Sequence, residues 1–213
     1  MKTNRHNLAY DFLYERIISH KLEPGTPIVE QEISSMLGIS RTPVREALRL
    51  LEAEGLIRHI PARGAYVSQI STQDVEEIFS LREILEIGAL RIGISRMSDA
   101  EIEEVEKVLL ALDENCKDVD FFNSDRILHE LIVTYSGNRR LVNFINMINA
   151  QIERIRHISA LRPQRLEKSK TEHLAIIQAI KKRDIEAASK LLYDHIENVK
   201  RSSLDVLSVM GTK

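Results

Sequence analysis

The sequence predicts a mainly α-helical protein, built from a small N-terminal unit that ends in a hairpin and a larger all-helical C-terminal bundle. Gly and Pro are sparse, at 8 and 5 of 213 residues, and aromatic residues make up 5% of the chain. These values disfavour a β-sandwich or barrel, whose many tight turns need Gly and Pro. Apolar residues instead recur at helical spacing between short breaks, which is typical of amphipathic helices.

The first 70 residues have the pattern of three helices followed by two strands. A first helix is expected over about residues 4–20, before the breaker cluster 22–27, and a second over 30–37. Gly38 is suited to the left-handed conformation that ends a helix. The third helix begins after Ser40, whose hydroxyl can cap its first turn, and closes at Gly55. Strands at 56–60 and 65–68, joined by a turn, complete a predicted winged helix-turn-helix domain over residues 1–70.

Three arginines form one stripe on the third predicted helix. Arg41, Arg45 and Arg49 are spaced four residues apart, on a face separate from the apolar residues. The second helix of a helix-turn-helix enters the DNA major groove, where Arg can bind guanine and phosphate through paired hydrogen bonds. The alternative is a solvated basic face that pairs with nearby glutamates, but the turn before this helix and the hairpin after it favour DNA. The predicted DNA-binding residues, the last two at the hairpin tip, are Arg41, Thr42, Arg45, Arg49, Arg63 and Gly64.

From Thr72 onward the sequence predicts six long helices separated by short loops. Ser71 or Thr72 can cap the first of them, and Asp184 is expected to open the last. Because long helices joined by short loops pack antiparallel, residues 71–213 are expected to form an all-α antiparallel bundle. The expected helices cover about residues 72–96, 99–115, 118–136, 138–160, 163–182 and 184–209.

Four polar residues lie on the apolar faces of three bundle helices. Asp125 and His129 are four residues apart in the third helix, and His173 and His195 stand among apolar residues in the fifth and sixth. Burying unpaired polar groups is costly, so each needs an interior partner, and one divalent metal would satisfy all four. The alternative is that each histidine is an ordinary core residue with its own hydrogen-bond partner. His157 points away from the apolar stripe of its helix and is not expected in this site.

Several stretches carry a resemblance to a known family. The run GISRTPVREALRLLEAEGLIRHIPARGAYV resembles the winged-helix signature of the GntR family of bacterial transcription regulators. The runs DRILHELIVTYSGNRRL, EHLAIIQAIKKRD and DHI resemble the all-helical, ligand-binding FCD domain of its FadR subfamily, and six expected helices match the VanR-like group. The resemblance implies a homodimer that binds palindromic operator DNA through the arginine stripe and the hairpin tip.

For the bundle, the resemblance implies a metal site and an effector. Asp125, His129, His173 and His195 match the family's metal ligands, with Zn²⁺ as the first expectation and Ni²⁺, Mn²⁺ or Fe²⁺ as alternatives. The metal is expected beside a small carboxylate effector. Arg82 is a candidate for binding that carboxylate, although it can equally pair with Glu86 four residues further on.

Together these features and the resemblance predict a DNA-binding transcription regulator, a repressor or an activator, whose operator affinity is controlled by a small carboxylate bound next to a divalent metal. One alternative is a metal-sensing regulator, in which the ion itself is the signal. Another is a metalloenzyme, but no general base is evident beside the cluster. No apolar run reaches the roughly 18 residues of a membrane span, and the single cysteine, Cys116, fits a reducing cytosol. A cytoplasmic protein without membrane contact is therefore expected.

Overall fold

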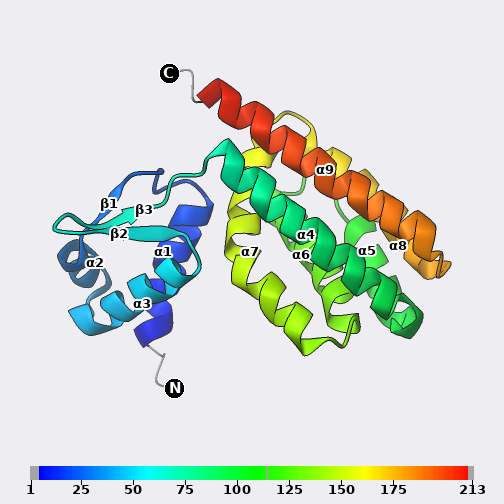
Figure 1. Ribbon diagram of the computed structural model, residues 1–213, viewed down its shortest axis with the longest axis horizontal. Helices are drawn as coiled ribbons and strands as arrows, with labels where there is room; N and C mark the ends of the chain where they lie inside the picture. Colours follow the sequence, from blue (N-terminus) through cyan, green and yellow to red (C-terminus); the bar gives the residue numbers. More distant parts are fainter. Residues whose placement is uncertain (1–4, 114, 211–213) are drawn as a thin grey trace.

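The computed structural model describes residues 5–113 and 115–210 and contains an N-terminal and a C-terminal part (Figure 1). The N-terminal part contains α1 (Arg5–Ile18), β1 (Pro27–Ile28), α2 (Glu30–Leu37), α3 (Arg41–Ala53), β2 (Ile57–Ile60) and β3 (Gly64–Val67). The C-terminal part contains α4 (Thr72–Gly93), the 3-10 turn η1 (Ile94–Arg96), α5 (Asp99–Leu110), α6 (Asp118–Tyr135), α7 (Arg139–Ala160), α8 (Arg165–Lys181) and α9 (Ile185–Met210). The predicted fold class, a mainly helical chain with a winged helix-turn-helix and a six-helix bundle, is confirmed over the described residues.

The wing is a three-stranded antiparallel sheet in the order β1-β3-β2. Strands β2 and β3 form the predicted hairpin, with Ile57 opposite Val67. Strand β1, which the sequence analysis did not predict, pairs with the other edge of β3 and puts Pro27 opposite Tyr66. Proline is tolerated there because an edge strand does not need every backbone N–H. The strand was missed because two residues inside a breaker cluster carry no alternating pattern.

Most helix ends follow the capping residues expected from the sequence. Gly38 ends α2 in the left-handed conformation, with φ of 64°. Ser71 and Asp74 form a reciprocal capping box at the start of α4, and the Asp184 carboxylate accepts a hydrogen bond from a first-turn N–H of α9. Ser40 differs from the expectation: it precedes α3, but its hydroxyl makes no capping hydrogen bond.

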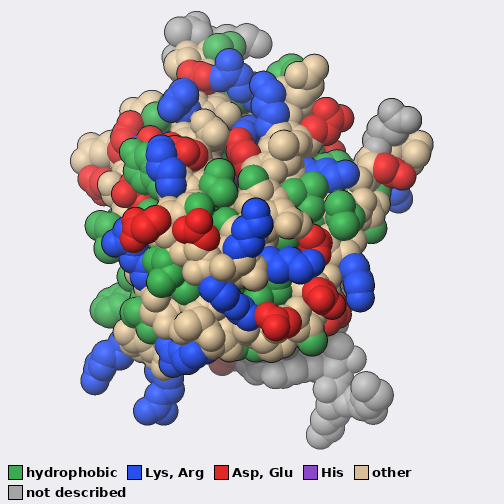
Figure 2. Space-filling view, turned by 90° about the vertical axis from the view of Figure 1, so that its right-hand side faces the viewer, with side chains coloured by type: hydrophobic (Ala, Val, Ile, Leu, Met, Phe, Trp, Pro, Cys, Tyr) green, Lys and Arg blue, Asp and Glu red, His purple; other side chains and the backbone are tan. Residues whose placement is uncertain are grey.

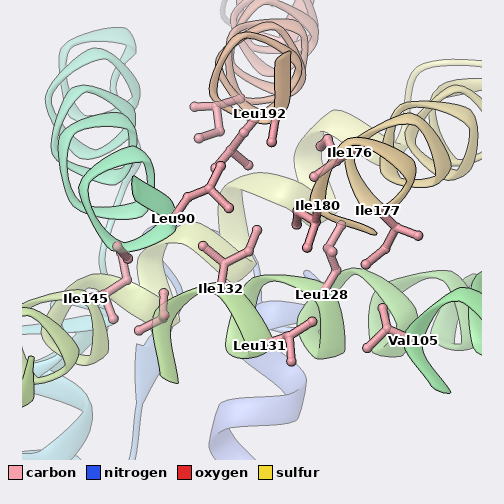
Figure 3. Close-up of a cluster of buried hydrophobic side chains, with 14 of the residues drawn as sticks. Leu90, Val105, Leu128, Leu131, Ile132, Ile145, Ile176, Ile177, Ile180 and Leu192 are labelled. Carbon is pink, nitrogen blue, oxygen red and sulfur yellow. The ribbon is translucent and has the colours of Figure 1, made fainter. Parts of the chain in front are cut away.

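Two hydrophobic clusters form the cores of the two parts. In the larger one, side chains from all six helices of the bundle converge, as Figure 3 shows for Leu90, Val105, Leu128, Ile145, Ile177 and Leu192. The smaller cluster joins α1, α2, α3 and the sheet, and it includes one residue of the bundle, Ala150 of α7. Helix α7 therefore packs against the N-terminal part as well as the bundle, as its position in Figure 1 shows.

The backbones of α4 and α6 are in close contact at Gly93. A Cβ atom at this position would lie 2.6 Å from the backbone carbonyl carbon of Tyr135, so a side chain does not fit. Glycine lets the two backbones approach because it has no Cβ. Helix α4 carries Arg82 and Glu86, and α6 carries two of the predicted metal ligands, so this contact helps to set the spacing between those groups.

The surface carries charges of both signs. On the face that Figure 2 shows, Lys and Arg side chains are interspersed with Asp and Glu, in keeping with the net charge of −2. DNA binding must therefore depend on the local arrangement of α3 and the wing, because the overall charge does not favour it. In the part of the chain that the structure describes, no helix is long and apolar enough to cross a membrane.

Candidate metal centre and nucleic-acid interface

Helix α3 presents the predicted arginine stripe to solvent. Pro43 lies in its first turn, where a missing backbone N–H leaves no hydrogen bond unmade. The apolar face of the helix, with Val44 and Leu48, is buried in the N-terminal core. The opposite face is exposed and contains Arg41, Thr42, Arg45 and Arg49. The helix is thus fixed on one side and free to contact DNA on the other.

Two of these arginines bind side chains of α2 in the DNA-free protein. Arg45 Nε donates to Glu30 Oε2 at 2.7 Å, and Arg41 Nε donates to Gln31 Oε1 at 2.6 Å. Both contacts are exposed, and an exposed ion pair such as Arg45–Glu30 typically contributes only about 0–1 kcal/mol. The two guanidinium groups can therefore exchange these partners for DNA at little cost.

The tip of the wing carries the other two predicted DNA-binding residues, Arg63 and Gly64. Both are exposed, at the turn from β2 to β3. Gly64 has φ of 95°, which other residues adopt only with strain, and no heavy atom lies within 4 Å of where its Cβ would be. A bare backbone next to an exposed arginine suits close approach to a DNA backbone or minor groove.

The four predicted metal ligands converge inside the bundle. Asp125 and His129 lie one turn apart on α6, His173 lies on α8 and His195 on α9, and all four are buried. Each offers one ligand atom, and these atoms all lie within 4.8 Å of one another. His173 Nε2 lies 3.2 Å from His195 Nε2 and 3.4 Å from Asp125 Oδ1. Helix α6 and the later pair α8 and α9 thus bring one polar cluster together.

The spacing of these atoms fits a single divalent ion. Ligand atoms about 2.0–2.1 Å from a tetrahedral metal lie roughly 3.3 Å apart. Besides the two separations above, His129 Nε2 lies 3.8 Å from Asp125 Oδ2, and His195 Nε2 lies 3.9 Å from Asp125 Oδ1. Small side-chain rotations would bring all four atoms to coordination distance. Three imidazoles and one carboxylate are donors that suit Zn²⁺, Ni²⁺, Mn²⁺ or Fe²⁺.

Two glutamates hold the histidine rings in place. His129 Nδ1 donates to Glu86 Oε2 at 2.5 Å, and His195 Nδ1 donates to Glu172 Oε2 at 2.7 Å. In each ring Nε2 is therefore unprotonated and directs its lone pair toward the cluster, the arrangement found around protein-bound metals. Arg165 in turn binds Glu172 through two hydrogen bonds, of 3.0 and 2.5 Å.

The charge states of the cluster also suit a metal. Burial, together with the neighbouring His173, lowers the pKa of His195 to about 3. Burial lowers the pKa of His173 as well. Burial opposes ionisation of Asp125, but Arg156 and His129 outweigh it and hold the pKa of that carboxyl well below its usual range. Neutral imidazoles and an ionised carboxylate are the forms that coordinate a metal ion.

Arg82, the candidate effector-binding residue, forms the intrahelical pair that the sequence offered as the alternative. Its Nε donates to Glu86 Oε1 at 2.8 Å, and its Nη2 donates to His129 Nε2 at 2.9 Å. Its Nη1 is buried and has no hydrogen-bond partner among the described residues. Arg82 thus contacts the cluster directly and keeps one donor nitrogen unused.

A small cavity of about 20 Å³, partly open to solvent, lies beside the cluster on a side that Arg82 does not line. Asp125 and His173 form part of its wall, and three cationic side chains form another part: Arg156, Arg165 and Lys170. Arg156 Nη2 lies 2.8 Å from Asp125 Oδ2 and donates to the backbone oxygen of Phe122 at 3.1 Å. An anion in this cavity would lie between basic side chains and the metal cluster.

The sequence analysis did not single out Glu172, Arg165 or Arg156. Glu172 directly precedes His173, and Arg156 directly precedes His157, so these neighbours point to different sides of their helices. Only the relative placement of α6, α7, α8 and α9 shows that Arg156 reaches Asp125 and that Glu172, next to the predicted ligand His173, reaches His195. His157 lies outside the cluster and stacks on Phe122, with ring centroids 3.8 Å apart.

An exposed arginine stripe on a winged helix-turn-helix, joined to a separate helical domain with a buried polar site, is the architecture of a DNA-binding transcription regulator. The chain belongs to the GntR family: residues 6–67 match bacterial regulatory proteins of the gntR family, and residues 77–198 match the FCD domain.

Known proteins of similar sequence are regulators. The chain is 31% identical to the uncharacterized HTH-type transcriptional regulator YdhC of Bacillus subtilis, over 89% of this chain and 86% of the relative. It is 30% identical to the HTH-type transcriptional repressor RspR of Escherichia coli K12, over 91% of this chain and 86% of the relative. The protein is therefore a transcriptional regulator and not an enzyme, as the sequence predicted.

Solved structures share the fold. A GntR transcriptional regulator from Rhodococcus sp. RHA1 superposes with a TM-score of 0.78 at 22% identity, covering 95% of this chain and 99% of that one. The Zn²⁺-bound FCD domain of the transcriptional regulator TM0439 superposes with a TM-score of 0.59 at 23% identity, covering 66% of this chain and 98% of that one. At these identities the likeness extends to the fold alone.

Proposed function

We propose that the chain binds palindromic operator DNA as a homodimer, and that a small carboxylate bound beside a divalent metal in the bundle controls its operator affinity. The observation that carries this proposal is the convergence of four buried ligand atoms next to a cavity with three cationic side chains. The Zn²⁺-bound FCD domain of TM0439 supports a metal in a domain of this fold.

Asp125, His129, His173 and His195 would hold the ion, with Zn²⁺ as the first choice and Ni²⁺, Mn²⁺ or Fe²⁺ as alternatives. A bound divalent ion supplies a positive, Lewis-acidic anchor for a carboxylate oxygen. The residues of the chain keep the ring nitrogens pointing at that position, exclude most of the water from it and supply further positive charge.

A carboxylate is the proposed ligand because the cavity is basic. Arg156 and Arg165 present guanidinium groups, which bind carboxylates through two parallel hydrogen bonds, and Lys170 adds a third cation. Arg82 does not line this cavity, and it stays a candidate contact only for a carboxylate that reaches its unused Nη1 from the metal side of the cluster. To act as an effector, the ligand must bind one arrangement of the protein more tightly than another.

DNA would be bound by residues 1–70, and residues 71–213 would bind the effector and dimerise. Each subunit would place Arg41, Thr42, Arg45 and Arg49 in one major groove and bring Arg63 and Gly64 to the flanking backbone or minor groove. The neighbouring helices α4 and α7 carry exposed apolar side chains that a second subunit would cover: Leu81, Ile84, Phe144 and Met147.

A double variant tests the metal site. His173→Ala with His195→Ala should lose the bound metal, measured by elemental analysis of protein purified without chelator, and should lose any metal- or carboxylate-dependent change in operator affinity. About one metal per subunit after this change would show that the ligand set is wrong. In wild-type protein, a response to the metal without any carboxylate would favour the metal-sensing regulator over the carboxylate-controlled one.

A further inference from the structure

Helix α7 contacts the N-terminal part through the segment 150–156, close to the end of the recognition helix α3. Ala150 is buried in the N-terminal core. The Gln151 side chain lies against Gly55, where a Cβ atom would come within 2.9 Å of Gln151 Nε2. A translation or rotation of α7 would therefore displace the residues of the DNA-binding part that pack against it, because closely packed groups leave no free space for the movement.

Two further residues of α7, Glu153 and Arg154, bind the N-terminal part through polar contacts. Tyr14 Oη donates to Glu153 Oε2 at 2.6 Å, which ties α1 to α7. Arg154 Nη2 donates at 2.8 Å to the backbone oxygen of Ser68, in the segment between β3 and α4. Burial lowers the pKa of Arg154 to about 10. These contacts join α7 to α1 and to the segment that leads from β3 into α4.

The opposite side of the same two turns faces the metal site. Arg156 makes the ion pair with Asp125 and the hydrogen bond to the Phe122 backbone, and it lines the basic cavity. A metal ion coordinated by Asp125 competes with Arg156 for that carboxylate, and an anion in the cavity competes with Asp125 for Arg156. Filling the site thus changes the contacts of Arg156. This residue lies only two positions after Arg154 and three after Glu153, the residues that bind the N-terminal part.

We propose that the α7 segment 150–156 carries the signal between the two parts, with Arg156 responding to the filled site and the Tyr14–Glu153 hydrogen bond passing the change to α1. This inference rests on the proposed function, because it explains how that ligand site reaches the DNA-binding part. Tyr14 and Glu153 are positioning residues here: they touch neither the metal, the effector nor DNA.

The chain offers a matched pair of variants for the test. Tyr14→Phe removes the hydroxyl that binds Glu153 on α7. Tyr10→Phe removes a hydroxyl one turn earlier on the same helix, which binds Glu54 of the DNA-binding part itself, at 2.8 and 2.9 Å. Both changes delete one buried or half-buried hydroxyl bound to a carboxylate, but only the first cuts a contact between the two parts.

Two measurements on the full chain are compared with and without Zn²⁺ and excess acetate, the simplest carboxylate. The first is affinity for an operator selected from a random DNA pool. The second is amide hydrogen exchange of α1. In wild type and in Tyr10→Phe, adding Zn²⁺ and acetate should change operator affinity about fivefold or more. It should also change the rate of amide hydrogen exchange in α1. Tyr14→Phe should bind Zn²⁺ equally well, yet change operator affinity less than about twofold and leave exchange in α1 unaltered.

The outcomes separate this inference from the proposed function. If wild-type operator affinity does not respond to Zn²⁺ and acetate, the proposed function fails, while a Tyr14-dependent exchange response in α1 still supports the α7 connection. If operator affinity responds equally in Tyr14→Phe and wild type, the inference is overturned and the proposed function stands. An equal loss of response in Tyr10→Phe would also overturn it, because the effect would then not depend on α7.

Discussion

Glu172→Gln should weaken metal binding although Glu172 is not a ligand. Its Oε2 accepts the hydrogen bond from His195 Nδ1 at 2.7 Å, which leaves the other ring nitrogen facing the cluster. Its pKa is lowered to about 2: burial opposes ionisation, but the His195 and Arg165 hydrogen bonds outweigh burial. At neutral pH it is therefore an anion that accepts hydrogen bonds from His195, Arg165 and Asn198.

A glutamine cannot replace this anion. Its amide has one acceptor oxygen and one NH₂ group, so if the oxygen serves His195, the NH₂ points at the Arg165 guanidinium, which has only donors. The His195 ring loses a charge-assisted partner and part of its fixed orientation. Loss of such a partner typically reduces metal affinity about 10- to 100-fold, which corresponds to roughly 1.4–2.7 kcal/mol.

Competition for Zn²⁺ against a chromophoric chelator measures this affinity at neutral pH. Glu167→Gln is the matched control, because Glu167 lies on the same helix but is exposed. The control should keep wild-type affinity. A change of less than about twofold in Glu172→Gln, in protein shown to be folded, would refute the argument that the Glu172–His195 pair prepares the ligand.

Three further predictions concern other parts of the molecule. Arg45→Ala should weaken specific operator binding about 5- to 150-fold, because one bidentate base contact contributes roughly 1–3 kcal/mol. The free energy of unfolding should not change, because the ion pair of Arg45 with Glu30 is exposed. Unchanged operator affinity at physiological salt would contradict the recognition role of Arg45. Ile84→Lys, at a side chain that is 68% exposed on α4, should shift the dimer toward monomer in sedimentation experiments, whereas Leu110→Lys, at 60% exposure on α5, should not. Burial lowers the pKa of His157 from 6.5 to about 4. As the pH falls, His157 is therefore protonated in the unfolded chain before it is protonated in the folded protein. The folding stability that depends on a neutral His157 should be lost as pH falls from about 6.5 to about 4. Urea midpoints of wild type and His157→Gln should then converge as the pH falls through that window, and parallel curves would count against this cause.

The order of the elements was predictable because each signal is local. Gly38 has to adopt a left-handed conformation at the end of α2, and Pro43 fits only the first turn of α3, so both mark boundaries without knowledge of the tertiary structure. Strand β1 is different. Its two residues become a strand only because β3 offers a free edge, and pairing across that distance leaves no pattern in the sequence.

The ligands of the candidate metal centre were predictable because their signal is also local in the sequence, whereas the residues that bind the ligands were not. His173 and His195 stand out because a polar residue on an apolar helix face needs a partner, and face assignment depends only on helical periodicity. The partners of the ligands do not stand out in this way. Glu172 and Arg156 resemble ordinary surface charges until the packing of the helices turns them toward His195 and Asp125.

Through the close contact at Gly93, a nonpolar residue affects the geometry of the candidate metal site. Any side chain there would push α4 away from α6, since its Cβ would lie 2.6 Å from a backbone atom of Tyr135. Two turns along α4, the 2.5 Å hydrogen bond between Glu86 and His129 spans the same gap between these helices. Metal affinity can therefore diverge between related regulators with identical ligands, through substitutions that alter only how closely two helices pack.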